Sequence, residues 1–429
     1  MTLAAWTAVA VFVAVYVLIA TERVHRVAAA LGGAAVVLGL GIVTSQEAFY
    51  SAETGVDWDV IFLLLGMMLV VGVLRRTGIF EYLAIRSAKL AGGRPYRVLV
   101  LLVLVTAAAS ALLDNVTTVL LVAPVTLLVC DRLGLPPVPF LIAEALASNI
   151  GGAATLVGDP PNIIIASRAD LSFTDFLVHM LPIVLVVLAA FLLLARVLFR
   201  GALRAEGGDP AALMALDERE AITDPALLLR GSVVLAAILV GFLAQRQTGV
   251  APSVVALVGA GVLLLLSPLH PRDLIADVEW ETLLFFIGLF ILVGALVHVG
   301  ALELLAEQLA TVTGDAVGPT LLVVLVGSAL VSAVVDNIPY VTAMTPVVES
   351  LIEGNPALGQ DGALWWALAL GADLGGNATL IGASANVVVV GIAARNGLHI
   401  SFVQWLRYGV PTAVVSIAIC VPYVLLRYA

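Results

Sequence analysis

Long hydrophobic segments alternate with short polar stretches along the whole chain. Eight of these segments approach or reach the about 17–25 residues that cross a bilayer as a helix. They cover residues 3–20, 27–43, 59–75, 172–195, 230–245, 251–268, 281–297 and 403–426. Two longer hydrophobic regions, interrupted by glycines and polar residues, cover 96–168 and 319–395. The pattern predicts an all-α polytopic membrane protein.

The composition agrees with a membrane location. Of the 429 residues, 62% are hydrophobic and 12% are charged, whereas a soluble domain has roughly 45–50% apolar residues. Segment 3–20 lacks a basic start and is followed at once by Thr-Glu-Arg at 21–23, so we interpret it as a retained first crossing and not as a secretory signal. Cys130 and Cys420 lie in apolar runs, which argues against a disulfide framework or a cysteine metal site. No basic stripe suggests a nucleic-acid partner.

The second half of the chain repeats the first. Val-Asp-Trp-Asp at 56–59 corresponds to Val-Glu-Trp-Glu at 278–281, at an offset of 222 positions. After an insertion of two residues, Gly-Gly-Ala-Ala-Thr-Leu-Val-Gly at 151–158 corresponds to Gly-Gly-Asn-Ala-Thr-Leu-Ile-Gly at 375–382. These correspondences predict a first repeat at 1–200, a cytoplasmic linker at 201–229 and a second repeat at 230–429.

Each irregular region is long enough for a re-entrant hairpin, which enters and leaves on one side, followed by one crossing with a broken helix. The predicted hairpins cover 97–131 and 319–350, and the predicted broken helices cover 139–168 and 363–395. Five crossings per half give about 10 crossings, and an odd number inverts the second repeat relative to the first. With the amino terminus outside, all 20 Lys and Arg residues except Arg168, Arg246 and Arg427 lie on the cytoplasmic side. We therefore expect a multi-pass protein of the plasma (inner) membrane with both termini outside.

Two segments, 79–90 and 301–311, mix Leu or Ile with charged residues at helical spacing. They predict either solvated loop helices or helices that lie in the membrane plane and link a fixed frame to a moving part. The pattern alone does not distinguish these two interpretations.

A polar pair interrupts each of the long hydrophobic regions. Asp114 and Asn115 lie in the middle of the apolar stretch 98–130, which as one helix would be roughly 50 Å long and would exceed a hydrocarbon core of about 30 Å. The chain must therefore turn back at this pair, and Asp336 and Asn337 occupy the same place at an offset of 222. The turn lies either in water outside the membrane or at mid-membrane. Its short polar tip favours mid-membrane, where protein or a water-filled cavity satisfies the freed backbone groups.

Paired glycines, two prolines and an asparagine interrupt the helix expected at 148–162. Such a break exposes carbonyl and amide groups that can bind a cation or an anion. The partner stretch at 372–386 keeps the glycines, Thr and Asn but lacks the prolines. A kinked structural helix is the alternative for either stretch alone, but two breaks in corresponding places favour a binding site at the bilayer midplane. We expect the substrate and ion site to include Asp114, Asn115, Thr117, Gly151, Gly152, Thr155, Asp159, Asn162, Asp336, Asn337, Gly375, Asn377, Thr379, Ser384 and Asn386.

Several carboxylates are predicted at membrane depth without a basic residue beside them in the sequence. Each costs about 2.5–3.5 kcal/mol at the centre of a helix on insertion scales. A carboxylate that alternates between a protonated and a cation-bound form has a functional reason to be there, whereas a carboxylate that only caps a half-helix has a structural one. The candidates for binding H⁺ or Na⁺ are Asp114, Glu144, Asp159, Asp336 and Asp373.

At these residues the chain resembles the ArsB/NhaD branch of the ion transporter superfamily, most closely the permeases similar to the melanosomal P protein. The likeness rests on Asp-Asn-Val-Thr-Thr at 114–118, Leu-Ile-Ala-Glu at 141–144 and the stretch 148–162, and it extends over most of residues 56–427. It implies a scaffold that forms a homodimer, a mobile unit made of both hairpins and both broken helices, and an elevator-like cycle. Related dicarboxylate carriers have Ser-Asn-Thr at the hairpin tips. Asp-Asn at both tips of this chain instead favours coupling to H⁺ or Na⁺.

The repeats and the resemblance together predict a secondary active transporter of a small inorganic or organic ion, an ArsB-like anion or metalloid permease coupled to H⁺ or Na⁺. The alternatives are a Na⁺/H⁺ antiporter, a dicarboxylate or citrate carrier and, from a different class, an ion channel. An enzyme is not expected, because the histidines lie near predicted crossing ends and no Gly-x-Ser-x-Gly motif occurs. No cofactor is expected beyond H⁺ or Na⁺, with Na⁺ at the hairpin tips and helix breaks. Asparagine at position 114 or 336 is expected to uncouple transport from the ion gradient.

Overall fold

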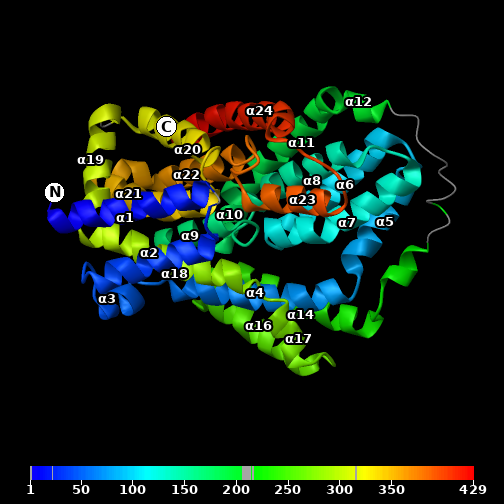
Figure 1. Cartoon of the computed structure of the whole chain (residues 1–429), viewed down its shortest axis with the longest axis horizontal. Helices are drawn as coiled ribbons and strands as arrows, with labels where there is room; N and C mark the ends of the chain where they lie inside the picture. The colour runs from blue at the N-terminus through cyan, green and yellow to red at the C-terminus, as the bar shows by residue number, and fades with distance from the viewer. Residues whose placement is uncertain (1, 22, 205–213, 215–216, 315) are drawn as a thin grey trace.

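The computed structural model describes residues 2–21, 23–204, 214, 217–314 and 316–429, and its regular elements in these ranges are helices (Figure 1). The first half contains α1 (Leu3–Ala20), α2 (Arg26–Gly39), α3 (Ser45–Tyr50), α4 (Trp58–Arg76), α5 (Ile79–Leu90), α6 (Pro95–Ser110), α7 (Asn115–Leu133), α8 (Pro137–Gly152), α9 (Pro160–Ala169), α10 (Phe173–His179), α11 (Leu181–Leu198) and α12 (Arg200–Leu203). The second half contains η1 (Glu218–Ala221), α14 (Pro225–Leu243), α15 (Gln245–Thr248), α16 (Pro252–Leu266), α17 (Pro271–Ala276), α18 (Trp280–His298), α19 (Ala301–Thr313), α20 (Val317–Ser332), α21 (Asn337–Gly354), η2 (Pro356–Gly362), α22 (Ala363–Gly375), α23 (Ser384–Arg395) and α24 (Phe402–Tyr428).

The all-α prediction is confirmed for the described residues. Six helices are long and apolar enough to cross a membrane, namely α4, α7, α11, α14, α18 and α24. The shorter apolar helices include α6 and α20, which precede the predicted hairpin tips, and also α2 and α16. Helix content alone does not fix the number of crossings, so the figure of about 10 stays a prediction.

Two predicted segments differ from the helices of the structure. The segment predicted as one crossing at 172–195 is divided into α10 and α11, which meet at Met180, just before Pro182 at the start of α11. The last residues of the predicted linker at 201–229 are helical, because α14 begins at Pro225. Asp224 caps this helix by accepting hydrogen bonds from the amides of Ala226 and Leu227 at 3.0 and 2.9 Å, and proline is well suited to the first helical position. Residues 205–213 and 215–216 of the linker lie outside the described part of the chain.

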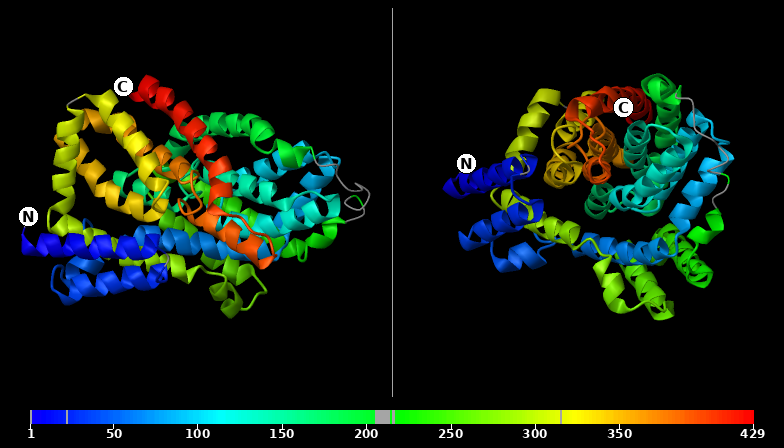
Figure 2. Two further views of the ribbon diagram at one scale, coloured as in Figure 1. Left: turned by 45° about the horizontal axis from the view of Figure 1, so that its top comes forward. Right: turned by 45° about the vertical axis from the view of Figure 1, so that its right-hand side comes forward.

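The two halves contain the same succession of helices. α4 to α9 correspond in order to α18 to α23, and α6 and α20 each have 16 residues and begin 222 positions apart. The segments 79–90 and 301–311 are helical, as α5 and α19. Both stand across the direction of the long helices, α19 at one end of the molecule and α5 at the other (Figures 1 and 2). This arrangement agrees with helices that link other parts of the chain, as the second interpretation of these segments requires.

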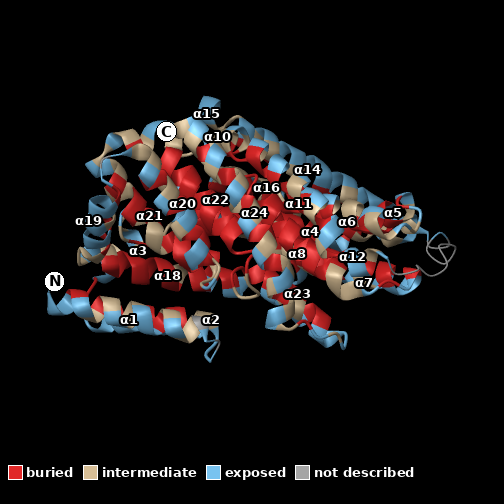
Figure 3. Cartoon of the chain, turned by 90° about the horizontal axis from the view of Figure 1, so that it is seen from above, coloured by how far each residue is buried: buried red, intermediate tan, exposed pale blue. Residues whose placement is uncertain are grey.

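The interior is formed by the helices that carry the predicted breaks. Every residue from Phe140 to Gly152 in α8 and from Ala363 to Gly375 in α22 is buried. Burial also distinguishes α18 from α14. In a hydrophobic stretch of 18 residues, 72% of the residues of α18 are buried but only 28% of those of α14. Figure 3 shows this contrast between the buried centre and the exposed outer helices. The exposed face of α14 is apolar, as expected of a surface in contact with lipid tails.

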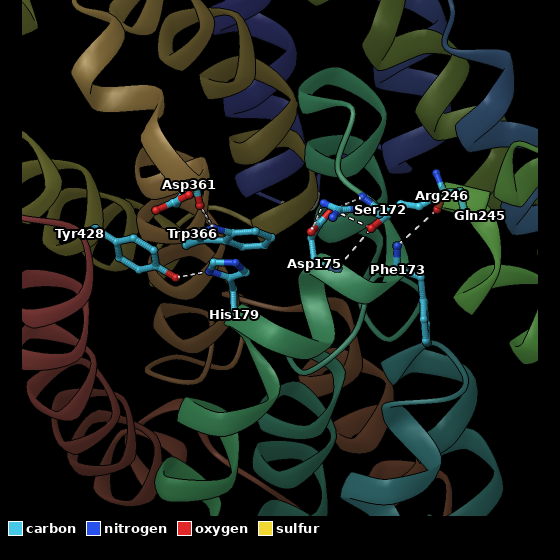
Figure 4. A network of polar contacts seen from close by, with 9 residues as sticks. All are labelled: Ser172, Phe173, Asp175, His179, Gln245, Arg246, Asp361, Trp366 and Tyr428. Carbon is cyan, nitrogen blue, oxygen red and sulfur yellow. Dashed lines mark hydrogen bonds and ion pairs between the residues drawn. The ribbon is translucent and has the colours of Figure 1, made fainter. Parts of the chain in front are cut away.

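A polar belt joins parts of both halves (Figure 4). It includes Ser172, Asp175, His179, Gln245, Arg246, Trp366 and Tyr428. The imidazole of His179 stacks on Trp366, with ring centroids 4.9 Å apart, and its Nδ1 lies 2.6 Å from the hydroxyl of Tyr428. Nearby, Arg246 forms an ion pair with Asp175, at 2.5 Å between Nη2 and Oδ1. The belt therefore fixes α10 against α15, α22 and the end of α24.

The belt predicts a pH dependence of stability. Burial lowers the pKa of His179 and the Arg427 guanidinium lowers it further, against the opposite effects of Asp175 and Asp361. The unfolded chain therefore binds a proton at higher pH than the folded chain, and stability falls as pH drops below about 6.5. We expect the unfolding temperature of the detergent-purified protein to fall between pH 7.5 and 5.5. His179→Phe keeps a ring on Trp366 and should flatten this slope, whereas His399→Phe at an exposed position should not. An equal slope in both variants would contradict the assignment.

Candidate functional site

Each helix break is closed by an asparagine from the helix that follows it. The Nδ2 of Asn162 in α9 donates to the carbonyl oxygens of Gly152 and Thr155 at 3.4 and 3.0 Å. In the second half, Asn386 in α23 donates to the corresponding carbonyls of Gly376 and Thr379 at 3.0 and 2.9 Å. These bonds satisfy backbone groups that the breaks release from the helical ladder, as buried backbone requires.

Hydroxyl groups tie each hairpin tip to the neighbouring helix break. Thr155 and Ser110 donate to the carbonyl oxygens of Ala111 and Ser148, each at 2.6 Å. The second half repeats the arrangement, with Thr379 donating to Ala333 at 2.5 Å and Ser332 donating to Ala372 at 2.6 Å. Each hairpin and its broken helix therefore form one body.

The glycines of the two breaks allow this close approach. A Cβ atom on Gly151 would lie 2.2 Å from the carbonyl oxygen of Ala107, and one on Gly375 would lie 2.4 Å from the Cα atom of Ala329. Gly152 likewise faces the carbonyl oxygen of Gly158, at 2.6 Å from such a Cβ. Because Gly151 and Gly375 have no side chain, α6 and α20 can pack directly against the helix breaks.

The two hairpins meet on a single carboxylate. The Nδ2 of Asn115, at the tip of the first hairpin, donates to Oδ2 of Asp159 at 2.9 Å. The Nδ2 of Asn337, at the tip of the second hairpin, lies 3.3 Å from both oxygens of the same carboxylate. Asp159 itself immediately precedes α9 in the first helix break. Both hairpin tips and one break therefore converge at this point.

Asn149 extends the network to the second helix break. It accepts a hydrogen bond from Asn115 at 3.1 Å and donates to the side-chain oxygens of Asn377 and Asn386, each at 3.0 Å. We call the six connected residues the polar centre; each is at most 3% exposed. Its members are Asn115, Asn149, Asp159, Asn337, Asn377 and Asn386.

A second carboxylate lies beside the polar centre. Asp373 is fully buried, and neither of its carboxylate oxygens has a hydrogen-bond partner at normal distance and angle. It is close enough to Asp159 for their charges to interact, and it faces Asn162, whose Oδ1 is also unpartnered. No Lys, Arg or His of the described chain forms an ion pair with Asp159 or Asp373. Two uncompensated carboxylates this deep need a proton or a bound cation.

The remaining predicted carboxylates have other surroundings. Asp114 and Asp336 cap α7 and α21, accepting hydrogen bonds from the amides of Thr117 and Ile338 at 2.7 and 3.1 Å. Glu144 accepts a hydrogen bond from the Thr126 hydroxyl, has one unpartnered oxygen and is not hydrogen-bonded to the polar centre. The capping alternative thus describes both hairpin aspartates, while their part in coupling stays a prediction. Asparagine caps helices as well as aspartate does, so Asp→Asn at these positions isolates the charge.

Contacts from other helices reach the edges of the site. The hydroxyl of Thr117 donates to Oε1 of Glu279 at the start of α18, at 3.2 Å. The hydroxyl of Ser384 donates to Oδ2 of Asp336 at 2.6 Å and accepts a hydrogen bond from Arg26 at 2.9 Å. Thr117, Asp336 and Ser384 therefore lie where the hairpins and breaks touch α2 and α18.

That Asn115, Thr155, Asn162, Asn337, Thr379 and Asn386 line one central cavity stays a prediction. In the structure each of these side chains forms hydrogen bonds to Asp159, to Asn149 or to backbone carbonyls. Two cavities adjoin elements of the site. One cavity, of about 550 Å³, adjoins α9 at Leu156, Ile163 and Ser167. The other, of about 490 Å³, adjoins the second hairpin tip.

Three residues of the site were absent from the predicted set. Asn149 could have been found, because the offset of 224 aligns it with Asp373, a predicted coupling residue. Glu279 and Arg26 gave no such signal, since each lies far along the chain from the motif that it contacts. Their contribution depends on tertiary packing.

The comparisons with known proteins agree with this architecture. A family model described as "Citrate transporter" matches residues 16–371. The 46 kDa membrane protein of Mycobacterium leprae is 54% identical over 421 residues, which cover 98% of each chain. An "Uncharacterized transporter" of Mycobacterium tuberculosis is 54% identical over 424 residues, again 98% of each chain. The human P protein is 35% identical over 502 residues, which cover 98% of this chain and 60% of the P protein.

A solved structure shares the fold. The crystal structure of the YdaH transporter of Alcanivorax borkumensis aligns with a TM-score of 0.61 and 17% identity, over 85% of this chain and 84% of that chain. The fold, the apolar helices and these relatives define a multi-pass membrane transporter, which fits the expectation that the protein is not an enzyme. More specifically, the chain belongs to the citrate transporter family. The predicted kinship with permeases similar to the P protein is confirmed.

Proposed function

We propose that the protein is a secondary active transporter that moves a small inorganic or organic ion by alternating access, coupled to H⁺ or Na⁺. The observation that carries this proposal is the convergence of both hairpin tips and both helix breaks on the polar centre, around Asp159 and beside Asp373. A buried carboxylate without a cation is costly. The centre therefore needs a proton or a cation in at least part of its cycle, which is the requirement of an ion-coupled carrier.

The donor set fits H⁺ or Na⁺. It consists of carboxylate and amide oxygens with backbone carbonyls close by, which are hard ligands. The described residues contain no group of three His, Cys, Asp or Glu side chains able to hold a metal ion. Asp159, Asp373 and the amide oxygens of the centre would hold Na⁺. Protonated Asp373 would instead donate to the unpartnered Oδ1 of Asn162.

We infer an elevator-like movement of the hairpins and broken helices, α6 to α9 and α20 to α23, against a scaffold that includes α2, α4, α16 and α18. The hydroxyl contacts at the tips and breaks hold the first group together. Its polar contacts with the scaffold are separate hydrogen bonds, such as Ser167 to Asp57 at 2.6 Å and Thr117 to Glu279 at 3.2 Å. Such bonds can exchange for water without disturbing either body. The proposal includes a homodimer formed through the scaffold, to be tested by cross-linking in the membrane.

The orientation is also a proposal, in which both termini lie outside the cell and the linker lies in the cytoplasm of the plasma membrane. It rests on the distribution of basic residues. Position 207, which lies outside the described residues, is a suitable site for an introduced cysteine. Rapid labelling of Gly207→Cys from outside intact cells would overturn the orientation.

The substrate that we propose is an anion or a metalloid, as for an ArsB-like permease. A citrate or dicarboxylate carrier is the second candidate because the matching family model carries that description. A Na⁺/H⁺ antiporter is the third, since the polar centre alone could exchange these ions. Asp-Asn at both hairpin tips argues for ion coupling in all three cases.

Reconstitution separates these candidates. Purified protein in proteoliposomes should be tested with arsenite, antimonite, citrate and succinate, each with and without a pH or Na⁺ gradient. Gradient-driven uptake with saturation and counterflow identifies a carrier and its substrate. Na⁺-dependent proton movement without any of these substrates indicates the antiporter. Flux that shows neither saturation nor counterflow would indicate a channel and contradict the proposal.

A further inference from the structure

The cavity at the second hairpin is lined by an arginine side chain, whereas the polar centre includes no basic residue. It has a volume of about 490 Å³ and lies between α1, α2, the tip of the second hairpin and α23. Its charged or titratable lining residues are Tyr16, His25, Arg26, Glu281 and Asp336. The cavity is large enough for a small organic anion or an inorganic oxoanion.

Arg26 is placed at an unusual position for a positive charge. It is the first residue of α2, a helix of 14 residues without an acidic residue in its first turn. A cation is unfavourable at a helix amino terminus, where the helix dipole is positive. The Arg26 guanidinium is held there by a hydrogen bond to the hydroxyl of Ser384 at 2.9 Å and by the face of Phe285, 5.6 Å from the ring centroid. The guanidinium and the end of α2 thus place two positive potentials at one cavity.

The carboxylates that line the cavity already have hydrogen-bond or ion-pair partners. The oxygens of Asp336 accept hydrogen bonds from the Ile338 amide at 3.1 Å and from the Ser384 hydroxyl at 2.6 Å. Glu281 lies 3.4 Å from Nε2 of His25, and both are largely exposed. Arg26 forms no ion pair with any described residue, although Asp336 and Glu279 are close enough for their charges to interact with it, and its one hydrogen bond goes to a neutral hydroxyl. Most of its donors therefore remain available to an anion.

The corresponding place in the first half lacks such a cation. Ser384 begins α23, and the residue at the start of α9 is Pro160, which has neither a hydroxyl nor an amide hydrogen. In the second half α16, the next long helix after α14, begins with Pro252 and Ser253, and the Ser253 hydroxyl donates a hydrogen bond to Asp59. The cavity there is lined by Arg246, but this guanidinium forms an ion pair with Asp175 at 2.5 Å, and Asp59 and Asp170 also line the cavity. Of the two cavities, the one beside the second hairpin is therefore the one lined by an arginine without an ion pair to a described residue.

We propose that Arg26 binds the oxygens of an anionic substrate, a carboxylate or an oxoanion, in the cavity beside the second hairpin. This inference rests on the proposed transport function and assigns the substrate's charge to a residue of α2, outside the hairpins. An incoming anion takes the place of Ser384 at the guanidinium. The Asp336 carboxylate accepts a hydrogen bond from the same Ser384 hydroxyl, so its negative charge lies close to the anion and repels it. The anion therefore binds best when a proton or a cation neutralises Asp336. Substrate and coupling ion then favour each other's binding.

The charge of the cavity can be measured without knowledge of the substrate. Val388 lines the cavity, and Val388→Cys in a Cys130→Ala, Cys420→Ala background provides one thiol. We compare its rates of reaction with anionic and cationic methanethiosulfonate reagents. Arg26→Gln should lower the anionic-to-cationic rate ratio by about tenfold or more, because it removes a unit charge at short range. Arg23→Gln, at a nearby exposed arginine outside the cavity lining, is the matched control. An equal effect of both substitutions would overturn the proposal.

A second measurement identifies the source of the anion. Citrate or sulfate should slow labelling of Val388→Cys in nanodiscs of neutral phosphatidylcholine, and Arg26→Gln should abolish this protection while Arg26→Lys retains part of it. Protection that appears only when phosphatidylglycerol is added would assign the site to a lipid headgroup. It would overturn the proposal that Arg26 binds a soluble anionic substrate. Failure of both anions to protect would also overturn it. Since labelling requires no flux, loss of transport in the reconstitution assay with intact protection would contradict the transport function and leave the anion site standing.

Discussion

Alanine in place of Asn115 or Asn337 should abolish substrate transport while leaving a folded protein. Each side chain brings one hairpin tip to the Asp159 carboxylate. A hydrogen bond to a charged group contributes about 1.5–3 kcal/mol, so a loss of at least about tenfold is expected from each substitution. The measurement is initial flux in proteoliposomes, normalised to the amount of monodisperse protein. Asn396→Ala is the matched control, because Asn396 bonds only a carbonyl of its own helix end.

The two variants must fail together if the hairpins share one site. Near-normal flux in both would refute the shared site. Loss in only one of them would place the site at a single hairpin, and the convergence on Asp159 would then be a structural contact.

Alanine in place of Gly151 or Gly375 should prevent the hairpins from seating on the broken helices. The added Cβ would meet backbone atoms at 2.2 and 2.4 Å, and backbone cannot move aside as a side chain can. Overpacking of a tight interior costs about 1–3 kcal/mol and sometimes more, and contact with backbone belongs at the upper end of that range. We expect a strong loss of monodisperse protein after detergent extraction and a lower unfolding temperature.

Gly327→Ala provides the comparison for these variants. Gly327 lies in α20, the same helix that packs against Gly375, but a Cβ there would meet nothing within 4 Å. Alanine also favours a helix by about 1 kcal/mol over glycine, so this variant should be as stable as the parent or more so. Equal stability of the Gly327 and Gly375 variants would show that the close approach of α20 to the break is unimportant.

Local sequence predicted the turn between α6 and α7 and the interruption between α8 and α9. The stretch 98–130 is too long for one crossing, and the Asp-Asn pair within it marks the turn because aspartate caps the returning helix. The breaks were visible from glycines and prolines at 148–162, and their partner was visible from the repeat. These are short-range signals, so the predicted and observed helices differ by only a few residues at most ends.

The composition of the polar centre depended on contacts that local sequence does not encode. Asp114 and Asp159 both looked like carboxylates at membrane depth, yet Asp114 caps α7 and only Asp159 receives both hairpins. The offset of 224 aligns Asp159 with Ala383, so symmetry between the halves could not identify it either. Arg26 was counted only as a cytoplasmic charge, because nothing near it in the chain points to Ser384. The choice among similar residues was made by tertiary packing.

The most direct test of ion coupling at the polar centre is gradient-driven accumulation by Asp159→Asn protein in proteoliposomes. Asparagine keeps the size of the side chain, removes the charge and presents an amide to the donors of Asn115 and Asn337. We predict that the variant no longer accumulates substrate when a pH or Na⁺ gradient is imposed, while the parent does. Asn396→Ala protein, altered away from the centre, should accumulate substrate like the parent. Accumulation by Asp159→Asn equal to that of the parent, under the same gradient, would contradict the account.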